Sequence, residues 1–510
     1  MREHLPKFVV VALLLIVVGV PLLLRPDRAA SEPADGDRPV LVVYTPHMES
    51  IRQEFARAFN RWRAGQGRPP VDFDWRTMGG ASDLRKTVLS QLTDLAREGR
   101  EDAGIGADLF FGGGDYEHDK LAEGITLKRD GETVRLPATV PPDLPPGLLE
   151  EAFPAPEIGG NRLYHPDRRW IGVVLSSFGI VYNRDVLELL ELPRPGTWSD
   201  LADPRYRGWI ALADPGHSGS AGATYHVILR RLGWHEGWAM LRRTFANARY
   251  FTNGASKVPV DVSAGEAAAG MCIDFYGRFQ AGAIGGDRVG YADPPGLTAV
   301  TADPVAILRG APHHELASEF IAWLLSRESQ TLWQLEAGSP GGPEQFELRR
   351  LPARRDLYQP GVMAERTDPE ANPFATARAI PDAMPGFYGL VAPIAHAMAI
   401  DIHDDLAAAW AAIQRTDPEH PNYPKMLARF DAMPEELTIH WPDAELETEW
   451  QRAIASPDHP RHEEAARTLD TFFDQLGERL AGDAMLDRRL AWTRFFRDNY
   501  REVVRLAPSE

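Results

Sequence analysis

Short apolar runs alternate with amphipathic stretches along the first part of the chain. The run at 39–44 is typical of a strand, and Ile51, Phe55 and Phe59 then recur with helical spacing. The succession repeats as a strand at 71–75, a helix at 82–96 and a strand at 107–111. Strands and helices that alternate through short links predict an α/β fold.

The same alternation continues through the middle of the chain. The stretch at 170–182 is typical of strands and is interrupted at Ser176 and Ser177. Further elements are expected as strands at 209–213 and 302–308, a helix at 222–232, a helix followed by a strand between 258 and 275, and one long helix at 315–335.

Beyond about residue 360 the strand signals nearly vanish. Helical patterns cover 390–414, 462–480 and 484–506. Residues 361–510 carry 15 basic and 27 acidic side chains, which is most of the excess negative charge of the whole chain. This part of the sequence therefore predicts an acidic α-helical C-terminal domain.

The N-terminus carries an apolar run at 8–24, preceded by Arg2 and Lys7 and ended by Arg25. Such a charge-flanked run predicts either a cleaved export signal or an uncleaved membrane anchor. The positive residues on its N-terminal side place the rest of the chain outside the cytoplasm. Residues 25–38 are polar and read as a linker.

Composition excludes several classes of function. The chain has 510 residues and a formal net charge of −18, which disfavours nucleic acid as a partner. Its one cysteine, Cys272, excludes an intrachain disulfide framework and a multi-cysteine zinc site. The sequence lacks the GxSxG, HExxH and GxxxxGK[ST] motifs, so an enzyme is not expected and no catalytic residue is assigned.

A series of short segments between 39 and 358 resembles the bacterial extracellular solute-binding proteins of ABC importers. Each segment is weak alone, and the resemblance rests on their order and spacing. The segments are VYTPH at 43–47, GASDL at 80–84, ADLFFGGG at 107–114, SFGIVYN at 177–183, TWSDL at 197–201, DPRYRG at 203–208, SGSA at 218–221, VDVSAGE at 260–266 and LPAR at 351–354. The nearest branch is similar to the binders of ferric iron and small anions.

The resemblance implies a two-lobed type II periplasmic-binding fold with a hinge. The first part of lobe 1 is expected at residues 39–125 and lobe 2 at residues 126–290. The chain is then expected to return to lobe 1 at residues 291–358. The helical domain at 361–510 and the N-terminal segment at 1–38 lie outside the resemblance.

Small-residue loops lead from strands into helices at several points, and helix N-termini present unpaired N–H groups and partial positive charge. Such loops suit an anion or an anion-bound metal. We therefore expect ligand contacts from Ala81, Ser82, Gly113, Ser177, Ser218, Gly219 and Ser220, and the resemblance adds His47, Asp274 and Tyr276.

Two kinds of ligand remain open. The ferric-binding relatives hold Fe(III) with two adjacent tyrosines, a histidine and a carboxylate, and the tyrosine pair aligns with Phe275-Tyr276, so one phenol is missing. Fe(III) cargo would then be held by His47, Asp274 and Tyr276, with Asp83 as another carboxylate near the family position. Alternatively a phosphonate, phosphate ester or carboxylate binds the helix N-termini. No resident cofactor is expected.

The expected mechanism is closure of the two lobes over the ligand, followed by docking to an ABC permease. A second hypothesis is a membrane-tethered sensor or scaffold whose helical tail binds a partner protein. A third is a secreted hydrolase, which no motif supports. The acidic helices have a simpler interpretation as well, because they can pack on one lobe and expose a charged face to solvent.

Overall fold

The computed structural model describes residues 38–129, 132–285, 287–378, 387–456, 458–479 and 484–508. The apolar run at 8–24, expected as a signal or anchor, lies outside these residues. Within the described ranges, no helix has both the length and the apolar character needed to cross a bilayer.

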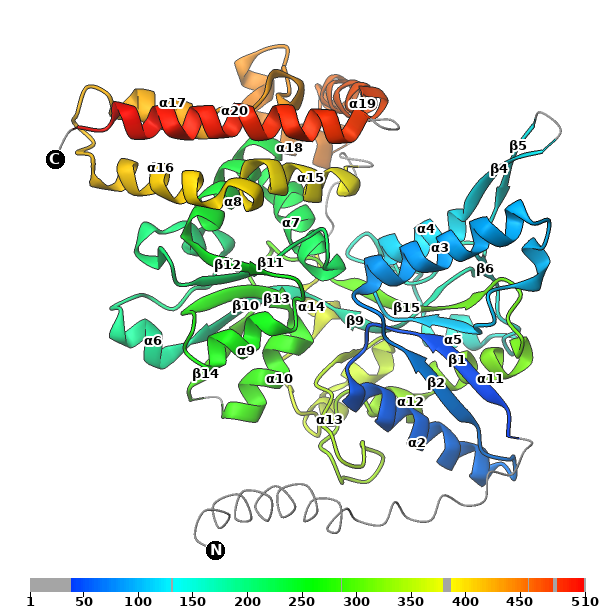
Figure 1. Ribbon diagram of the computed structural model, residues 1–510. Coiled ribbons are helices and arrows are strands. Elements are labelled where there is room, and N and C mark those ends of the chain that lie inside the picture. The colour runs from blue at the N-terminus through cyan, green and yellow to red at the C-terminus, as the bar shows by residue number, and fades with distance from the viewer. Residues whose placement is uncertain are drawn as a thin grey trace, which may run out of the picture.

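Lobe 1 is built on a sheet with the strand order β16-β9-β15-β3-β1-β2, with β6 paired to β15. β1 runs parallel to β2 and β3, whereas β15 runs antiparallel to β3 and β9. Helices lie on both faces of this sheet, with α3 and α4 on one side and α2, α11 and α12 on the other (Figure 1). The elements up to the first crossing are β1 Val40–Tyr44, α2 Glu49–Gly65, β2 Asp72–Arg76, α3 Ala81–Arg97, β3 Leu109–Phe111, α4 Asp115–Glu123, β4 Ile125–Arg129, β5 Glu132–Leu136, β6 Thr139–Val140, α5 Leu148–Ala152, β7 Glu157–Ile158, β8 Asn161–Arg162 and β9 Ile171–Ser176.

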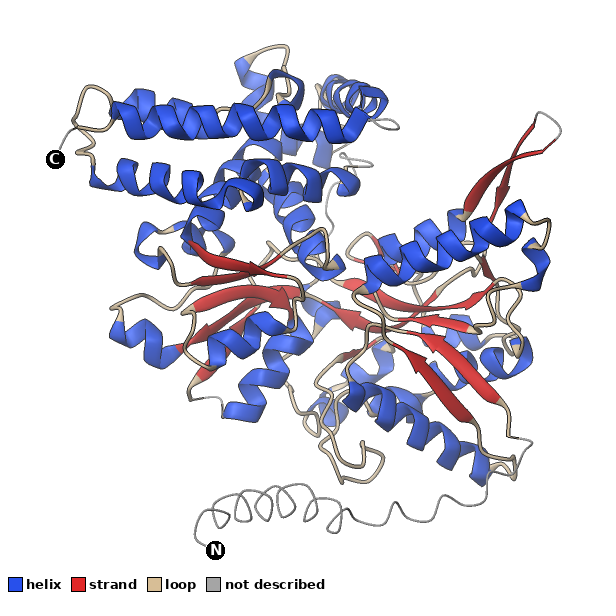
Figure 2. Ribbon diagram, in the orientation of Figure 1, coloured by secondary structure: helices blue, strands red, loops and turns tan. Residues whose placement is uncertain are grey.

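Lobe 2 is built on a second sheet with the order β12-β11-β13-β10-β14. β11 is parallel to β12 and β13, and β10 is antiparallel to β13 and β14. Its elements are β10 Phe178–Asn183, α6 Arg184–Leu189, β11 Ile210–Ala213, α7 Gly219–Leu232, α8 Trp234–Asn247, β12 Ala248–Thr252, α9 Lys257–Ser263, β13 Ala269–Ile273, α10 Asp274–Ile284 and β14 Val289–Ala292. Figure 2 shows the strands of the two lobes as separate groups, each flanked by helices.

The chain changes lobe between β9 and β10, at Ser177, and returns between β14 and β15. Both β9 and β10 are buried along their full length, although they belong to different sheets. The segment from 126 to 176 therefore joins the first sheet, because β6 and β9 pair with β15 there. We propose to place the lobe boundary at Ser177 instead of at residue 126.

The returning chain adds β15 Thr301–Leu308, α11 His314–Leu324, α12 Arg327–Thr331, β16 Leu351–Pro352, α13 Pro360–Met363 and α14 Pro373–Thr376. The long helix expected at 315–335 is wrong, because Ser326 starts a new helix and its side chain accepts a hydrogen bond from the Ser329 amide.

A helical region covers lobe 2 on the side where α7 and α8 lie (Figure 1). It consists of α15 Tyr388–Met398, α16 His403–Arg415, α17 Tyr423–Asp431, α18 Ala444–Ala455, α19 His462–Arg479 and α20 Ala484–Leu506. The single helix expected at 390–414 is split between α15 and α16 by a short 3₁₀ turn at Ile400–Ile402.

This helical region does not have a core of its own. One continuous cluster of buried side chains includes Trp234, Trp238 and Leu241 of lobe 2 together with Phe430 and Phe496 of the helical region. Because apolar burial is the main stabilising contribution, the helical region and lobe 2 are expected to fold as one unit.

Arg242 of α8 is a polar connection inside this shared core. Its side chain is fully buried, and its guanidinium donates to the carbonyl oxygens of Phe430 and Ala432. The guanidinium also lies 5.3 Å from the ring centroid of Phe496. The lobe therefore satisfies backbone acceptors that the end of α17 would otherwise leave unpaired.

We predict that Arg242→Met lowers the free energy of unfolding by about 2–4 kcal/mol, since buried carbonyl groups lose their donors. Urea unfolding followed by tryptophan fluorescence measures the change. Arg243→Met is the matched control, because Arg243 is partly exposed and pairs with Asp431 at 2.7 Å, and its loss should cost less than about 1 kcal/mol. Independent unfolding of the helical region in the wild-type protein would contradict the shared core.

His396 forms a second polar connection. Its Nε2 lies 3.0 Å from Asp214 of lobe 2 and its Nδ1 lies 2.9 Å from Asp401, which in turn pairs with Arg489 of α20. The hydrogen bond to Asp214 is the main cause that raises the pKa of His396 above its ordinary value. His217 is another titratable group nearby and lies 4.0 Å from Asp214.

Because the folded-state pKa of His396 is raised, its contribution to stability is complete below the ordinary histidine pKa and is lost as the pH rises through the folded-state value. We predict that His396→Gln costs about 1–2 kcal/mol near pH 5.5 and clearly less near pH 8.5. Thermal unfolding across this pH range is the measurement. His440→Gln, at an exposed histidine, should change stability by less than about 0.5 kcal/mol throughout. An equal loss at both pH values for His396→Gln would argue against the charged pairing.

Candidate functional site

A cavity of about 570 Å³ lies between the lobes. This volume falls in the range of small-molecule sites. Lobe 1 contributes residues after β1, at the start of α3, at the start of α4 and on β15. Lobe 2 contributes the loop before α7, the loop at 253–256 and the start of α10, and the helical region contributes Tyr388.

The N-termini of α3, α4 and α7 meet at this cavity. Gly80 and Gly114 precede α3 and α4, and neither helix has a side-chain cap. Within the described part of the chain, the backbone amides of Ala81, Ser82 and Gly219 donate no hydrogen bond. These N–H groups and the positive ends of the helix dipoles form a local environment that favours negative charge.

The two lobes touch at one edge of the cavity. A Cβ atom on Gly80 of lobe 1 would lie 2.7 Å from the carbonyl oxygen of His217 in lobe 2. A Cβ on Gly219 would lie 3.6 Å from Oε1 of Glu117. The small residues found in these loops therefore permit close approach of the lobes.

A buried guanidinium lies behind the cavity wall. Arg350 donates to the Ser176 hydroxyl at 2.8 Å, to Nε2 of His47 at 3.0 Å and to the Asp303 carboxylate. It also lies 4.0 Å from the ring centroid of Phe275 in lobe 2. Arg350 thus connects four parts of the chain. They are the segment after β1, the end of β9 before the crossing, β15 after the return, and α10 of lobe 2.

This cluster sets the protonation of its members. Burial lowers the pKa of His47, so the ring is neutral and Nε2 accepts the hydrogen bond from Arg350. Burial alone would raise the pKa of Asp303, but the charge of Arg350 outweighs it and holds that pKa at about 2. The cluster is therefore a compensated ion pair with a neutral imidazole.

Four carboxylates line the cavity, and the described lining residues include no lysine or arginine. Asp303 is compensated by Arg350, and Glu117 by Arg85 and the Ser82 hydroxyl. Asp83 lies 3.6 Å from Lys86, and burial raises the pKa of Asp115. The carboxylates thus present hydrogen-bond acceptors, and Asp303, Glu117 and Asp83 each have a cationic partner.

Seven of the residues expected from the sequence line the cavity together. They are His47, Ala81, Gly113, Ser218, Gly219, Ser220 and Tyr276. Burial raises the pKa of Tyr276 to about 12, so its phenol is a neutral hydrogen-bond donor.

The other expected residues lie behind the wall. The Ser82 hydroxyl donates to Glu117 at 2.6 Å, and that of Ser177 donates to Asp293 at 2.7 Å. Asp274 is fully buried, and burial raises its pKa to about 7. Of these three side chains none lines the cavity, although the Ser82 amide is among the helix N-terminal donors.

Of the residues expected to hold a metal ion, His47 and Tyr276 line the cavity, whereas Asp274 lies behind its wall. Among the described residues, no three His, Cys, Asp or Glu side chains are grouped to hold a metal ion. The physical reason is visible at Phe275, where the ring that replaces a tyrosine packs on the cationic Arg350. A phenyl ring offers no oxygen ligand to a metal ion, so one ligand of the ferric-binding relatives is missing here.

Sequence reasoning missed Arg350, Asp303, Glu117, Tyr116 and Tyr388. Arg350 immediately precedes the LPAR segment, which is the one local signal that pointed near it. Tyr388 lies beyond the region of the family resemblance, so nothing in the motifs could have placed it at the cavity.

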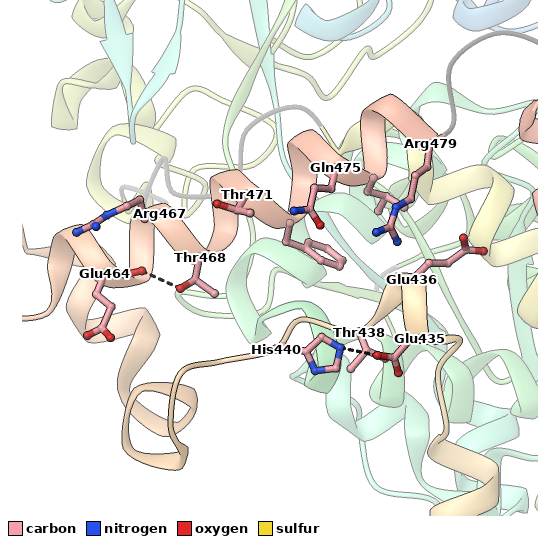
Figure 3. A pocket seen from close by; sticks show the side chains of 12 residues that line it. Glu435, Glu436, Thr438, His440, Glu464, Arg467, Thr468, Thr471, Gln475 and Arg479 are labelled. Carbon is pink, nitrogen blue, oxygen red and sulfur yellow. Dashed lines mark hydrogen bonds and ion pairs between the residues drawn. The ribbon is translucent and has the colours of Figure 1, made fainter.

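A second hollow of about 490 Å³ lies on the helical region, between α19 and the segment at 435–440. Figure 3 shows Glu435, His440 and Glu464 around it, with His440 paired to Glu435 at 2.9 Å. Most of its charged residues are exposed, and Glu436, Glu464 and Arg467 pair with residues outside the hollow. The cavity between the lobes is therefore the stronger candidate site.

Part of the chain matches a known family of proteins. Residues 155–358 match the sequence profile of the bacterial extracellular solute-binding proteins. The phosphoglycerate transport regulatory protein PgtC of Salmonella typhimurium is 28% identical over 162 residues, which are 32% of this chain and 40% of PgtC. An uncharacterized protein of Haemophilus influenzae is 28% identical over 161 residues, which are 31% of this chain and 46% of that protein. The matches thus span less than half the length of these relatives.

Two solved structures share the fold. The periplasmic binding protein AfuA from Actinobacillus pleuropneumoniae, with exogenous fructose-6-phosphate bound, has a TM-score of 0.52 at 16% identity, over 74% of this chain and 98% of AfuA. The periplasmic binding protein P5PA has a TM-score of 0.50 at 17% identity, over 73% and 99% of the two chains. The type II periplasmic-binding fold is therefore confirmed, and residues 155–358 are similar to the bacterial extracellular solute-binding proteins.

Proposed function

We propose that this protein captures a small phosphorylated or phosphonate anion outside the cytoplasm and presents it to an ABC permease. The observation that carries the proposal is the convergence of the N-termini of α3, α4 and α7 on the cavity between the lobes, with free amides on α3 and α7. Arg350 behind the wall adds positive charge, partly balanced by Asp303.

The rest of the cavity suits a hydroxyl-bearing carbon skeleton. Asp115 and Glu117 offer acceptors for hydroxyl groups, and the rings of Tyr116, Phe275 and Tyr276 offer apolar faces. A phosphate ester of a small hydroxy compound would use both features. The phosphoglycerate in the name of PgtC and the fructose-6-phosphate in the AfuA structure are compounds of this class.

Closure supplies the mechanism. The lobes are linked through β9–β10 and β14–β15, and their loops meet at Gly80 and His217. A ligand that contacts amides from α3 in lobe 1 and α7 in lobe 2 stabilises the closed arrangement through its greater affinity for it. The closed form would be the one that the permease recognises.

A panel of compounds tests the ligand class. We predict that 3-phosphoglycerate or fructose 6-phosphate raises the melting temperature, because a ligand at about 100 times its Kd adds about 2.7 kcal/mol to the folded state. Inorganic phosphate should have a smaller effect, because it lacks the hydroxyl-bearing skeleton. A shift with Fe(III)-citrate, and none with any phosphorylated compound, would contradict the proposal and restore the metal interpretation.

Gly80→Ala tests closure. The added methyl group would meet the His217 carbonyl at 2.7 Å only when the lobes are together, while the backbone φ of −80° at Gly80 accepts alanine. We predict about tenfold weaker binding of the active compound by calorimetry, a loss of about 1.4 kcal/mol, with little change in the ligand-free melting temperature. Gly196→Ala is the control, since nothing lies within 4 Å of its added Cβ. Unchanged affinity in Gly80→Ala would contradict closure at this edge.

A further inference from the structure

Tyr388, at the start of α15, belongs to the helical region and lines the cavity. Its hydroxyl donates to the Gly219 carbonyl at 2.8 Å, at the N-terminus of α7 in lobe 2. Its ring stacks on Tyr116 of lobe 1, with centroids 4.0 Å apart and an interplanar angle of 30°. One side chain of the helical region therefore touches both lobes.

Small residues make room for this arrangement. A Cβ on Gly222 of α7 would lie 2.9 Å from the Tyr388 hydroxyl, and a Cβ on Gly389 would lie 3.7 Å from that of Tyr116. On its other side, Tyr388 meets the ring of His226 edge-to-face at 5.3 Å. The tyrosine is thus held between defined neighbours of lobe 2 and is not a loose surface residue.

The helical region moves with lobe 2, because the two share one hydrophobic core and are joined through Arg242 and His396. Tyr116 belongs to α4 of lobe 1. The stack of Tyr116 on Tyr388 is therefore a contact between the two moving bodies, and it must separate when the cavity opens.

We infer that Tyr388 is a ligand-site residue and that its stack with Tyr116 is an interlobe latch, so that the helical region takes part in ligand capture. The stack of Tyr388 on Tyr116 exists only in the closed arrangement of the lobes. A ligand that favours closure therefore also favours this contact of the helical region with lobe 1. The ligand-binding part of this inference rests on the proposed function, whereas the latch itself does not.

The latch is tested without ligand. Cysteines introduced at Arg97 of lobe 1, whose side chain is 73% exposed, and at Leu189 of lobe 2, which is 78% exposed, accept spin labels. The native Cys272 is buried and should not react. Pulsed electron resonance then measures the distribution of distances between the lobes.

We predict that Tyr388→Leu and Tyr116→Leu each shift this distribution toward more separated lobes, and that the double variant shifts it no further than either single one. Tyr116→Leu is the essential second variant, because it lies outside the shared core and cannot act by disturbing the helical packing. Tyr423→Leu, in α17 of the helical region, is the control and should leave the distribution unchanged. An unchanged distribution in both single variants, or additive shifts, would overturn the latch.

Binding provides the second measurement, with whichever of 3-phosphoglycerate or fructose 6-phosphate raises the melting temperature of the wild-type protein. Tyr388→Leu should weaken its affinity about 2- to 10-fold, the range expected for an aromatic pair, and Tyr388→Phe should retain most of it. If neither compound binds the wild-type protein, the proposed ligand class fails while the distance measurement still decides the latch. Unchanged affinity in Tyr388→Leu would remove Tyr388 from the ligand site.

Discussion

The buried guanidinium of Arg350 is the interaction on which the cleft depends. It reaches Ser176 at the end of the last strand before the crossover, Asp303 on the first strand after the return, and His47 behind the first strand. It also packs on Phe275 of lobe 2. A charge buried at such a point is tolerated only when its donors are used, so these segments are held in one arrangement. The hinge of the two lobes is therefore built around a paired charge as well as around apolar contacts.

The residue at position 275 and the helix N-termini at the cavity bear on its ligand chemistry. Where the resemblance leads one to expect a tyrosine that binds iron, the chain places a phenylalanine whose face is covered by a cation. Together with the free amides at the ends of α3 and α7, this arrangement favours negative charge in the cavity of an otherwise acidic protein.

The helical region is joined to lobe 2 by a shared core. The helical region is not a separate appended domain. It extends the core of lobe 2 and contributes Tyr388 to the cavity wall. The helical region is therefore mechanically part of lobe 2. Among its described residues, Tyr388 is the one that lines the cavity, and Tyr388 also touches Tyr116 of lobe 1. A signal of cavity closure can therefore pass into the helices without any long-range pathway.

Local patterns in the sequence were enough to determine the α/β class, the interruption between Ser176 and Ser177, and the small-residue loops that precede α3 and α7. These features follow from spacing and turn chemistry, which act over a few residues. The place of Arg350, Asp303 and Tyr388 was decided only by the tertiary structure. Each meets partners far away along the chain, such as His47 for Arg350 and Tyr116 for Tyr388. Periodicity tells which face of an element is buried, but not which distant segment covers it, and that is why the ionic cluster and the tyrosine stack could not be seen in the sequence.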